Sequence, residues 1–296
     1  MDTEGRLQRY RDADCWPTEE ALAAMLDNQQ SAFVAVRNAL PALGHAVQVA
    51  AARLRVAGRL IYVGAGASGR LAVQDGVELH PTFGWPSERL VYLLAGGDAA
   101  VVRSVEGAED DAASGRADMA GLAPGPSDVV VSVAASGTTA FTRAAQSAAR
   151  AAGALTIAMA NNPTAPLLAE GEVAVLLRTG PEFLAGSTRM TAGTAQKIAL
   201  NLFSTQLMTE LGRVYQGLMV NVVPANAKLV DRSQRIVQAI TGCGREQAAA
   251  AWERARQDIK LAVLLLDGLD PREAAARLQG AHGDLRRARM AQADHR

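Results

Sequence analysis

The sequence predicts an α/β protein: a doubly wound sheet of five parallel strands, with an N-terminal helical arm before it and a C-terminal helical subdomain after it. Two observations carry this prediction. Between residues 59 and 177, five short apolar runs alternate with stretches of helical periodicity, which is typical of βαβ crossovers. On either side of this region, apolar residues recur at helical spacing.

The five predicted strands are runs rich in Val, Leu and Ile. Each run is almost continuously apolar rather than alternating, which indicates a strand that is buried on both faces of a sheet. Such a sheet needs helices on each side, and the intervals between the runs are long enough to hold them. The runs are RLIYVG (59–64), RLVYLLAG (89–96), DVVVSVAAS (128–136), LTIAMA (155–160) and VAVLL (173–177).

The predicted N-terminal arm covers residues 1–56. Its helix spans about 18–55 and carries an apolar stripe through Phe33–Ala51. Pro41 interrupts this stripe, and we expect the helix to break or kink there because proline lacks a backbone N–H group.

The predicted central domain covers residues 57–225 and ends in a long helix at 190–211. The C-terminal subdomain covers 226–296, where the turn signals TGCG and DGLDP separate helical segments. These segments are expected near 227–241, 245–267 and 271–279.

Composition excludes several classes of protein. The formal net charge is zero and aromatic residues make up 4% of the chain, so a nucleic-acid surface is not expected. The cysteines, Cys15 and Cys243, are far apart, and the histidines lack metal-ligand spacing, so we expect neither a disulfide framework nor a metal site. The N-terminus is polar and the longest apolar run, Leu261–Leu266, is too short to span a membrane. These features predict a cytoplasmic protein.

The first apolar run ends in a glycine-rich loop, GAGASGR at 64–70. Its spacing fits G-x-G-x-x-G between a strand and a helix, which is also typical of dinucleotide-binding proteins. A dinucleotide site needs an acidic residue at the end of the next strand, and Asp98 lies somewhat beyond that point. A P-loop is excluded because no Gly-Lys-Ser/Thr sequence follows.

The third apolar run ends in a second small, hydroxyl-rich loop, AASGTT at 134–139. In a flavodoxin-like strand order, the first and third strands flank the point where ligands bind, so both loops would face one crevice. Backbone N–H groups, helix dipoles and hydroxyls can hold an anion there without a lysine. The pair of loops favours a monophosphate over a dinucleotide; the alternative is two ordinary tight turns with incidental serines.

The two loops resemble the sugar isomerase (SIS) domain, and further stretches are similar to the N-acetylmuramic acid 6-phosphate etherases of bacterial cell-wall recycling. The similarity runs from about residue 58 to 245, and the flanking helices also fit. Relatives of these etherases include the glucokinase regulatory protein, a sensor rather than an enzyme. The similar stretches are GRLIYVGAGASGRL (58–71), PTFGWP (81–86), AGGDAAVVRSVEGAEDD (95–111), AASGTTAF (134–141), GPEFLAGSTRMTAGTAQK (180–197) and GRVYQGLMVNVVPANAKLV (212–230).

The chain departs from the family pattern at the predicted site. Ala67 stands where the family usually has the threonine of GAGTSGR, which removes a hydroxyl from the first loop. Thr138 stands where the family has the arginine of SGRTP in the second loop. The family's DASECPPT reads DGVELHPT at 75–82, so the glutamate is kept while Gly76, Val77 and Leu79 replace its neighbours.

The resemblance implies a lyase that needs no metal or redox cofactor. The sugar ring opens to the C1 aldehyde, a base removes the acidified C2 proton, lactate leaves from C3, and water adds back. By resemblance, Glu109 is the base and Glu78 is the acid for the departing oxygen. Glu78 has apolar neighbours, which predicts partial burial. Glu106, Glu109 and Asp110 have helical spacing and are expected to share a helix face.

The resemblance also implies the substrate-binding residues and the assembly. Glu182, Ser187 and Thr188 match a stretch that lines the sugar site of isomerase relatives. SIS relatives commonly dimerise, and the N-terminal stripe and the 190–211 helix offer apolar surface for a homodimer. The predicted phosphate-binding residues are Gly66, Ser68, Gly69, Arg70, Ser136, Gly137, Thr138 and Thr139.

Three other functions stay open at this point. A non-catalytic sugar-phosphate sensor would use the same fold, and an aldose–ketose isomerase would need the same C2 deprotonation. A nicotinamide dehydrogenase would use the glycine-rich loop alone. Glu78 and Glu109 favour the etherase over the sensor, and the stretches at 180–197 and 212–230 favour it over the isomerase.

Overall fold

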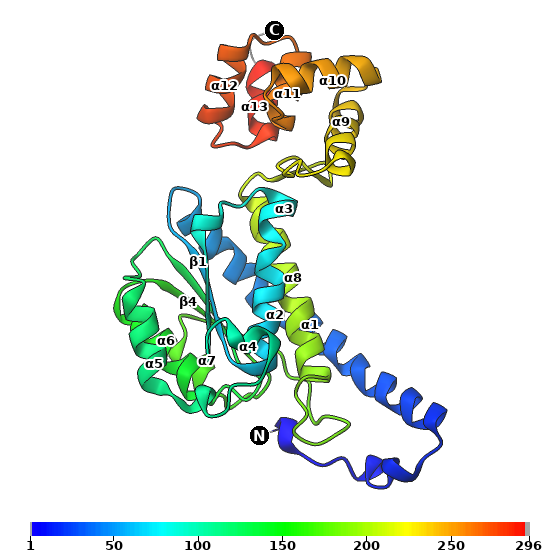
Figure 1. Cartoon of the computed structure of the whole chain (residues 1–296), viewed down its shortest axis with the longest axis vertical. Coiled ribbons are helices and arrows are strands. Elements are labelled where there is room, and N and C mark those ends of the chain that lie inside the picture. Colours follow the sequence, from blue (N-terminus) through cyan, green and yellow to red (C-terminus); the bar gives the residue numbers. More distant parts are fainter. Residues whose placement is uncertain (1, 294–296) are drawn as a thin grey trace. The chain divides into compact units, whose positions relative to one another are not determined.

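The computed structural model describes residues 2–293, and within that range five strands form one parallel sheet in the order β2-β1-β3-β4-β5 (Figure 1). The predicted fold class is therefore confirmed, as is the flavodoxin-like adjacency of the first and third strands. Residue 1 and residues 294–296, at the ends of the predicted arm and subdomain, lie outside the described residues. The strands are β1 (Leu60–Gly64), β2 (Leu90–Leu94), β3 (Val129–Val133), β4 (Leu155–Ala160) and β5 (Val173–Leu176).

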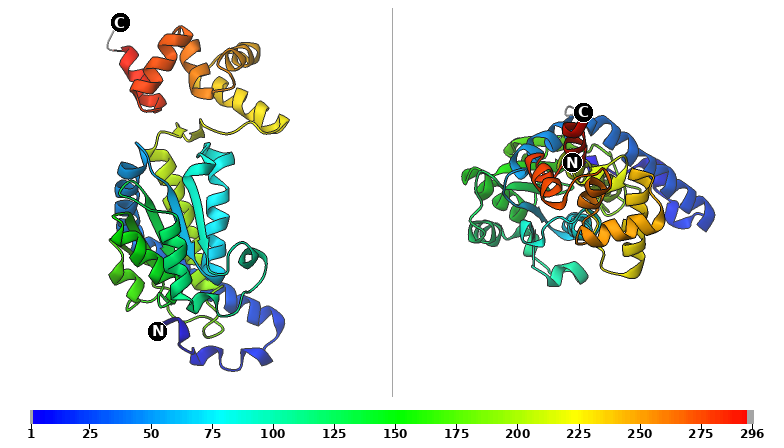
Figure 2. Two further views of the ribbon diagram at one scale, coloured as in Figure 1. Left: turned by 60° about the vertical axis from the view of Figure 1, so that its left-hand side comes forward. Right: turned by 90° about the horizontal axis from the view of Figure 1, so that it is seen from above.

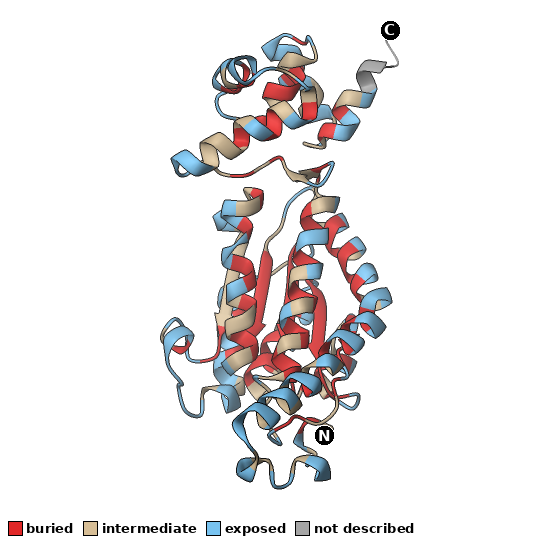
Figure 3. Cartoon of the chain, turned by 90° about the vertical axis from the view of Figure 1, so that its right-hand side faces the viewer, coloured by how far each residue is buried: buried red, intermediate tan, exposed pale blue. Residues whose placement is uncertain are grey.

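Helices cover both faces of the sheet, as a doubly wound fold requires (Figures 1 and 2). α5, α6 and α7 lie on one face, and α1, α2 and α8 lie on the other. Figure 3 shows the buried strands between helices whose outer sides are exposed. The helices are α1 (Thr18–Leu54), α2 (Gly66–Val77), α4 (Ala99–Val102), α5 (Ala112–Gly121), α6 (Ala140–Ala151), α7 (Pro166–Glu170) and α8 (Thr191–Glu210), with 3₁₀ turns at Asp2–Glu4, Gln8–Tyr10, Ala13–Cys15, Ser87–Arg89 and Ala108–Asp110.

Side chains of β1, an interior strand of the sheet, alternate between the two faces. Ile61 belongs to a buried cluster with Met119 of α5 and Phe141 of α6. Tyr62 points to the opposite face, where its hydroxyl donates to Asp75 of α2 at 2.8 Å. The continuous apolar run of the sequence is therefore a strand with both faces buried, as predicted.

The N-terminal helix α1 continues through Pro41, so of the two expected outcomes, a break or a kink, the break is wrong. A proline removes one helical hydrogen bond and crowds the preceding turn. The flanking residues Ala39, Leu43 and Val47 are buried, so one face of α1 is held by packing on both sides of the proline. Tertiary burial of this face, rather than local propensity, stabilises the helix across the interruption.

The chain divides into two compact units. The first comprises Met1–Gly76 and Glu88–Ser204 and contains the parallel sheet. The second comprises Val77–Ser87 and Thr205–Arg296 and contains the C-terminal helices. The domain boundaries expected from the sequence remain a prediction. Within residues 2–293, no helix combines the length and apolar character needed to cross a membrane.

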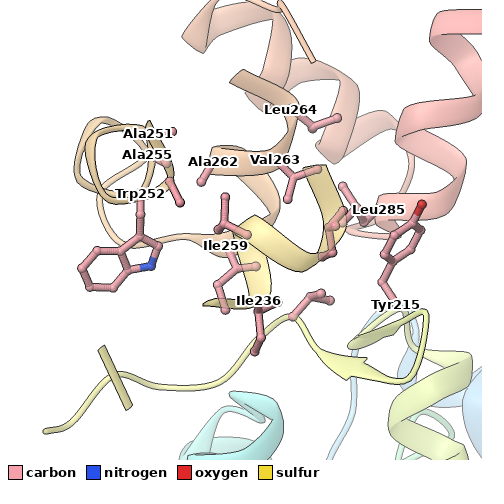
Figure 4. Close-up of a cluster of buried hydrophobic side chains, with 14 of the residues drawn as sticks. Tyr215, Ile236, Ala251, Trp252, Ala255, Ile259, Ala262, Val263, Leu264 and Leu285 are labelled. Atoms are coloured by element: carbon pink, nitrogen blue, oxygen red, sulfur yellow. The ribbon is translucent and has the colours of Figure 1, made fainter. Parts of the chain in front are cut away.

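The second unit is helical and has its own buried cluster, in which Trp252 is fully buried (Figure 4). The single helix predicted at 245–267 is instead two, because Arg256 and Gln257 adopt left-handed φ angles of +53° and +67°, and Asp258 then caps the second helix. The elements are α3 (Leu79–Phe83), α9 (Ala227–Thr241), α10 (Arg245–Arg254), α11 (Ile259–Leu266), α12 (Pro271–Gly280), α13 (Leu285–Ala293) and an unpredicted antiparallel pair, β6 (Val214–Tyr215) and β7 (Leu218–Met219).

Lys260 is a buried cation in this second unit. Lys260 belongs to α11 and is only 5% exposed to solvent. Its Nζ donates a hydrogen bond to the carbonyl of Gly283 at 2.7 Å. Burial lowers the pKa of Lys260 from 10.5 to about 8, although the nearby carboxylate of Asp258 acts in the opposite direction. The folded unit therefore holds the lysine proton more weakly than the unfolded chain does.

This difference makes stability depend on pH, and Lys260→Met should remove that dependence. The burial cost of the charged lysine is fully present below the folded pKa of about 8 and disappears as pH rises towards 10.5. Between about pH 7 and pH 9.5, we expect the wild type to gain roughly 1–2 kcal/mol of unfolding free energy relative to Lys260→Met. Urea unfolding at both pH values measures the gain. Lys228→Met, a change at an exposed lysine, is the control, and an equal gain relative to both variants would contradict the assignment.

Candidate active site

The two predicted loops leave adjacent strands at the same edge of the sheet. β1 and β3 pair in parallel with Gly64 opposite Val133, so the segments that follow them begin side by side. The first leads into α2 and the second into α6. Two helix N-termini thus lie at the carboxyl edge of the sheet, where backbone N–H groups and helix dipoles favour an anion.

Glycines allow the first loop to pass very close to the sheet. A Cβ atom at Gly69 would lie 2.2 Å from Cδ1 of Leu94 and 2.9 Å from the carbonyl carbon of Gly64. Gly66 has a left-handed φ of +53°, which favours glycine. Ser68, between them, is nearly buried. The glycine pattern therefore serves the packing of α2 against β1 and leaves its first turn without bulky side chains.

The second loop is organised by hydroxyl groups and one glycine. Oγ of Ser136 accepts hydrogen bonds from the backbone N of Thr138 at 3.2 Å and from its Oγ1 at 3.0 Å. Gly137 has a φ of +71°, and a Cβ atom there would lie 2.3 Å from Cβ of Ala165. Thr139 is the N-cap residue of α6, and its side chain makes no capping hydrogen bond. These bonds fix a compact loop in which Thr138 is exposed.

A cavity of about 350 Å³ lies beside the first loop. Gly66 and Arg70 line it together with Glu106 and Glu109, so the structure brings two predicted phosphate-binding residues to the predicted base. Its volume falls within the range of about 300–1,000 Å³ that is usual for small-molecule sites. The remaining lining residues are Ala65, Ala95, Ala100, Ser104, Val105, Gly107 and Ala108.

Glu109 reaches this cavity from a turn rather than from a helix. Glu106 lies in a turn, Gly107 has a left-handed φ of +71°, and Glu109 follows in a short 3₁₀ turn with Asp110. The predicted shared helix face is therefore wrong, because the glycine reverses the chain between the two glutamates. Both Glu106 and Glu109 still line the same cavity, and both side chains are exposed.

Glu78 lies at the junction of α2 and α3, in the second compact unit. Glu78 is exposed to solvent, so the predicted partial burial of this glutamate is wrong. The reason is local: Leu79 and Phe83, four residues apart, are the buried residues of α3, which leaves the preceding glutamate outside that packed face.

Glu182 has a structural contact that sequence reasoning missed. It is fully buried, and its two carboxylate oxygens accept the backbone N–H groups of Thr191 and Ala192, each at 2.9 Å. Glu182 therefore satisfies the first free amides of α8, where a negative charge also interacts well with the helix dipole. Ser187 and Thr188 are half-buried in the intervening loop, and the carbonyl of Thr188 accepts the N–H of Gly193 at 2.8 Å.

A second buried carboxylate, Asp75, was also missed. It accepts hydrogen bonds from Tyr62 Oη at 2.8 Å, Asn201 Nδ2 at 2.6 Å and Ser204 Oγ at 3.0 Å. Burial raises the pKa of Asp75, and these three hydrogen bonds oppose that rise. The network ties β1, α2 and α8 together beneath the candidate site. A tyrosine within an otherwise aliphatic strand was the one signal for it in the sequence.

The second loop should tolerate no side chain at Gly137. Gly137→Ala places a Cβ atom against Ala165 and also strains a left-handed backbone. Gly107→Ala is a matched control, because Gly107 has the same φ of +71° but no atom within 4 Å of its added Cβ. We expect Gly107→Ala to cost about 1 kcal/mol of unfolding free energy and Gly137→Ala to cost about 1–3 kcal/mol more. Urea unfolding measures both, and equal costs would show that the loop opens freely at Ala165.

Parts of this chain are similar to a known family and to solved structures. The family described as the glucokinase regulatory protein N-terminal SIS domain matches residues 42–150. Among solved structures, the phosphoheptose isomerase from Neisseria gonorrhoeae is 16% identical with a TM-score of 0.49, and the match covers 64% of this chain and 98% of that chain.

Similarity over nearly the whole chain is much stronger among etherases. The N-acetylmuramic acid 6-phosphate etherase of Deinococcus radiodurans is 51% identical over 278 residues, which cover 94% of this chain and 91% of that protein. The etherase of Cronobacter sakazakii is 45% identical over 287 residues, or 97% of each chain. The resemblance inferred from the loop motifs is confirmed, and the chain belongs to the N-acetylmuramic acid 6-phosphate etherase family.

Proposed function

We propose that this chain cleaves the D-lactyl ether of N-acetylmuramic acid 6-phosphate, giving N-acetylglucosamine 6-phosphate and D-lactate. The observation that carries the proposal is the 51% identity to an etherase over 94% of the chain. The cavity that joins Glu109 to the first glycine-rich loop supports it, because an elimination needs a base close to an anchored sugar phosphate.

The phosphate is proposed to bind between the two loops. Backbone N–H groups at the start of α2 and α6 are free of intrahelical partners, and hydroxyls lie among them. A dianionic phosphate would gain charge-assisted hydrogen bonds there as well as a favourable interaction with two helix dipoles. The residues assigned to this role are Gly66, Ser68, Gly69, Arg70, Ser136, Gly137, Thr138 and Thr139, with Glu182, Ser187 and Thr188 near the sugar.

The chemistry assigned to the two glutamates is a stepwise elimination. With the sugar open, the C1 aldehyde acidifies the C2 proton, which the carboxylate of Glu109 removes. The electron pair then expels the lactate oxygen from C3, and the carboxyl group of Glu78 supplies the proton that this oxygen needs. Water activated by a carboxylate then adds its hydroxyl group at C3, and the proton taken from the water returns to C2. One carboxyl must therefore be ionised and the other protonated at the start of the reaction.

Two substitutions separate these roles. Glu109→Gln should abolish both lactate release and exchange of the C2 hydrogen with deuterated water, because no base remains. Glu78→Gln should block lactate release but keep C2 exchange, since the base is still present. Each affected rate should fall at least about 10²-fold. Glu106→Gln is the control, because Glu106 lines the same cavity as Glu109 but has no assigned role.

The same assays distinguish the other functions. An aldose–ketose isomerase would give a ketose and no lactate, and a sensor would bind the sugar phosphate without exchanging the C2 hydrogen. Full lactate release by Glu78→Gln would contradict its assignment as the acid, and loss of lactate release in Glu106→Gln would then assign that role to Glu106.

We also propose that the chain acts as a homodimer in the cytoplasm. Cys15 and Cys243 are both free, as is usual in a reducing compartment. Along α1, three large apolar residues recur every seven positions on the exposed surface: Leu26, Phe33 and Leu40 are 70%, 66% and 50% exposed. This spacing is typical of a seam between two helices, and a second copy of the chain could cover it.

Light scattering tests the dimer. At micromolar concentration the wild type should have the mass of two chains, whereas Leu26→Glu combined with Phe33→Glu should give one chain, because it places charges in the proposed seam. Val56→Glu is the control, since Val56 is 88% exposed but lies beyond the end of α1. A monomeric wild type would contradict the proposal.

A further inference from the structure

Arg70 binds backbone carbonyl groups of the protein, a role that phosphate binding alone does not require. From α2, directly after the first glycine-rich loop, its Nε donates to the carbonyl of Ala100 at 2.8 Å and its Nη2 donates to the carbonyl of Arg103 at 3.0 Å. One of these carbonyls belongs to α4 and the other to the residue that ends it. A planar guanidinium suits this task, because its N–H groups form a rigid fork that can bind two acceptors at once.

The segment that receives these bonds has little else to hold it. Residues 101–107 are all exposed, and α4 is only four residues long. Within the described structure, the hydrogen bonds that connect residues 98–107 to residues outside 94–110 all come from Arg70. Two alanines give apolar anchors: Ala100 is buried, and Ala108, just after the segment, packs against the buried cluster of Met119 and Phe141. The guanidinium of Arg70 is therefore the principal polar link between this segment and the body of the first unit.

The same segment leads directly to Glu109. Gly96, Gly97 and Gly107 all have left-handed φ angles, of +86°, +67° and +71°. The chain therefore turns sharply at both ends of residues 98–107. Glycine at these turns also gives the unfolded backbone many other conformations. Arg70 and Glu109 line one cavity. Loss of the Arg70 bonds would remove the polar link of the cavity wall that leads to Glu109, and would leave that wall held by apolar packing.

We propose that Arg70 is a positioning residue that fixes segment 98–110 against the start of α2 and so holds Glu109 at the cavity. The inference rests on the proposed function for the role of Glu109 as the base. The inference also connects phosphate binding with proton removal. Arg70 lies in α2, which begins at the proposed phosphate-binding loop, and its side chain positions the base Glu109. Displacement of a reacting group by about 1 Å can lower a rate by about 10²-fold.

Arg70→Ala tests the proposal, with Arg103→Ala as the matched control. Arg103 lies on the same segment, is exposed, and loses an equal charge, yet its backbone carbonyl remains for Arg70. In Arg70→Ala, amide hydrogen exchange within 98–110 should become at least about tenfold faster, while exchange within α6 stays unchanged. The kcat for lactate release should fall about 10²-fold, in addition to any rise in KM from the loss of a phosphate contact. Arg103→Ala should match the wild type in each measurement.

Arg70→Lys provides a second variant that keeps the charge. One ammonium cannot reproduce the fork of the guanidinium, so exchange within 98–110 should again be faster and kcat lower than in the wild type. Added ethylguanidinium should restore part of kcat in Arg70→Ala. Unchanged exchange in both Arg70 variants would overturn the proposal, as would a raised KM with an unchanged kcat, which would assign Arg70 to the phosphate alone. If amide exchange within 98–110 is faster in the Arg70 variants but the wild type releases no lactate, Arg70 still fixes the segment and the etherase function is rejected.

Discussion

The close approach of β1 and α2 at Gly64 and Gly69 is the constraint on which the rest of the site depends. A Cβ atom added at Gly69 would lie only 2.2 Å from Leu94, so no side chain fits between the helix and the sheet. As a result, α2 begins directly at the carboxyl edge of the sheet. That placement brings its N-terminus beside the loop that follows β3. It also fixes the direction in which Arg70 leaves the helix, and through Arg70 the segment that carries Glu109.

The carboxylates of the chain divide according to what surrounds them. Asp75 and Glu182 are buried and have their oxygens taken up by two or three hydrogen bonds, so they hold helices in place. Glu78 and Glu109, the acids with proposed roles in the reaction, are exposed. Buried acids are stabilised by the fold, whereas acids with assigned chemistry lie on short turns. Chemistry at an open turn needs external positioning, because the turn itself supplies few contacts.

Sequence patterns predicted the sheet well because its strands are short apolar runs that alternate with helical stretches, an order that the apolar helix α11 does not have. The positions of the two loops followed from the strand order. Predictions failed where tertiary contacts outweigh local preference. Packing carries α1 through Pro41, two left-handed residues divide the helix expected at 245–267, and Gly107 breaks the expected acidic helix. Asp75 could not be recognised as structural because Asn201 and Ser204, two of its partners, are 126 and 129 residues away in the sequence. Glu182 lies close to Thr191 in the sequence, but no local motif marks the hydrogen bond between them.

The two hydrogen bonds of Glu182 have a consequence for how this family can change. They join residue 182 to the start of α8 and so close the intervening residues into a loop whose two ends are pinned together. Residues inserted into or deleted from such a loop change its shape without shifting the strands before it or the helix after it. Variation in length can therefore accumulate there at little cost to folding. The carboxylate of Glu182 holds this loop closed. The loop can therefore change to fit ligands of other shapes while the sheet stays the same.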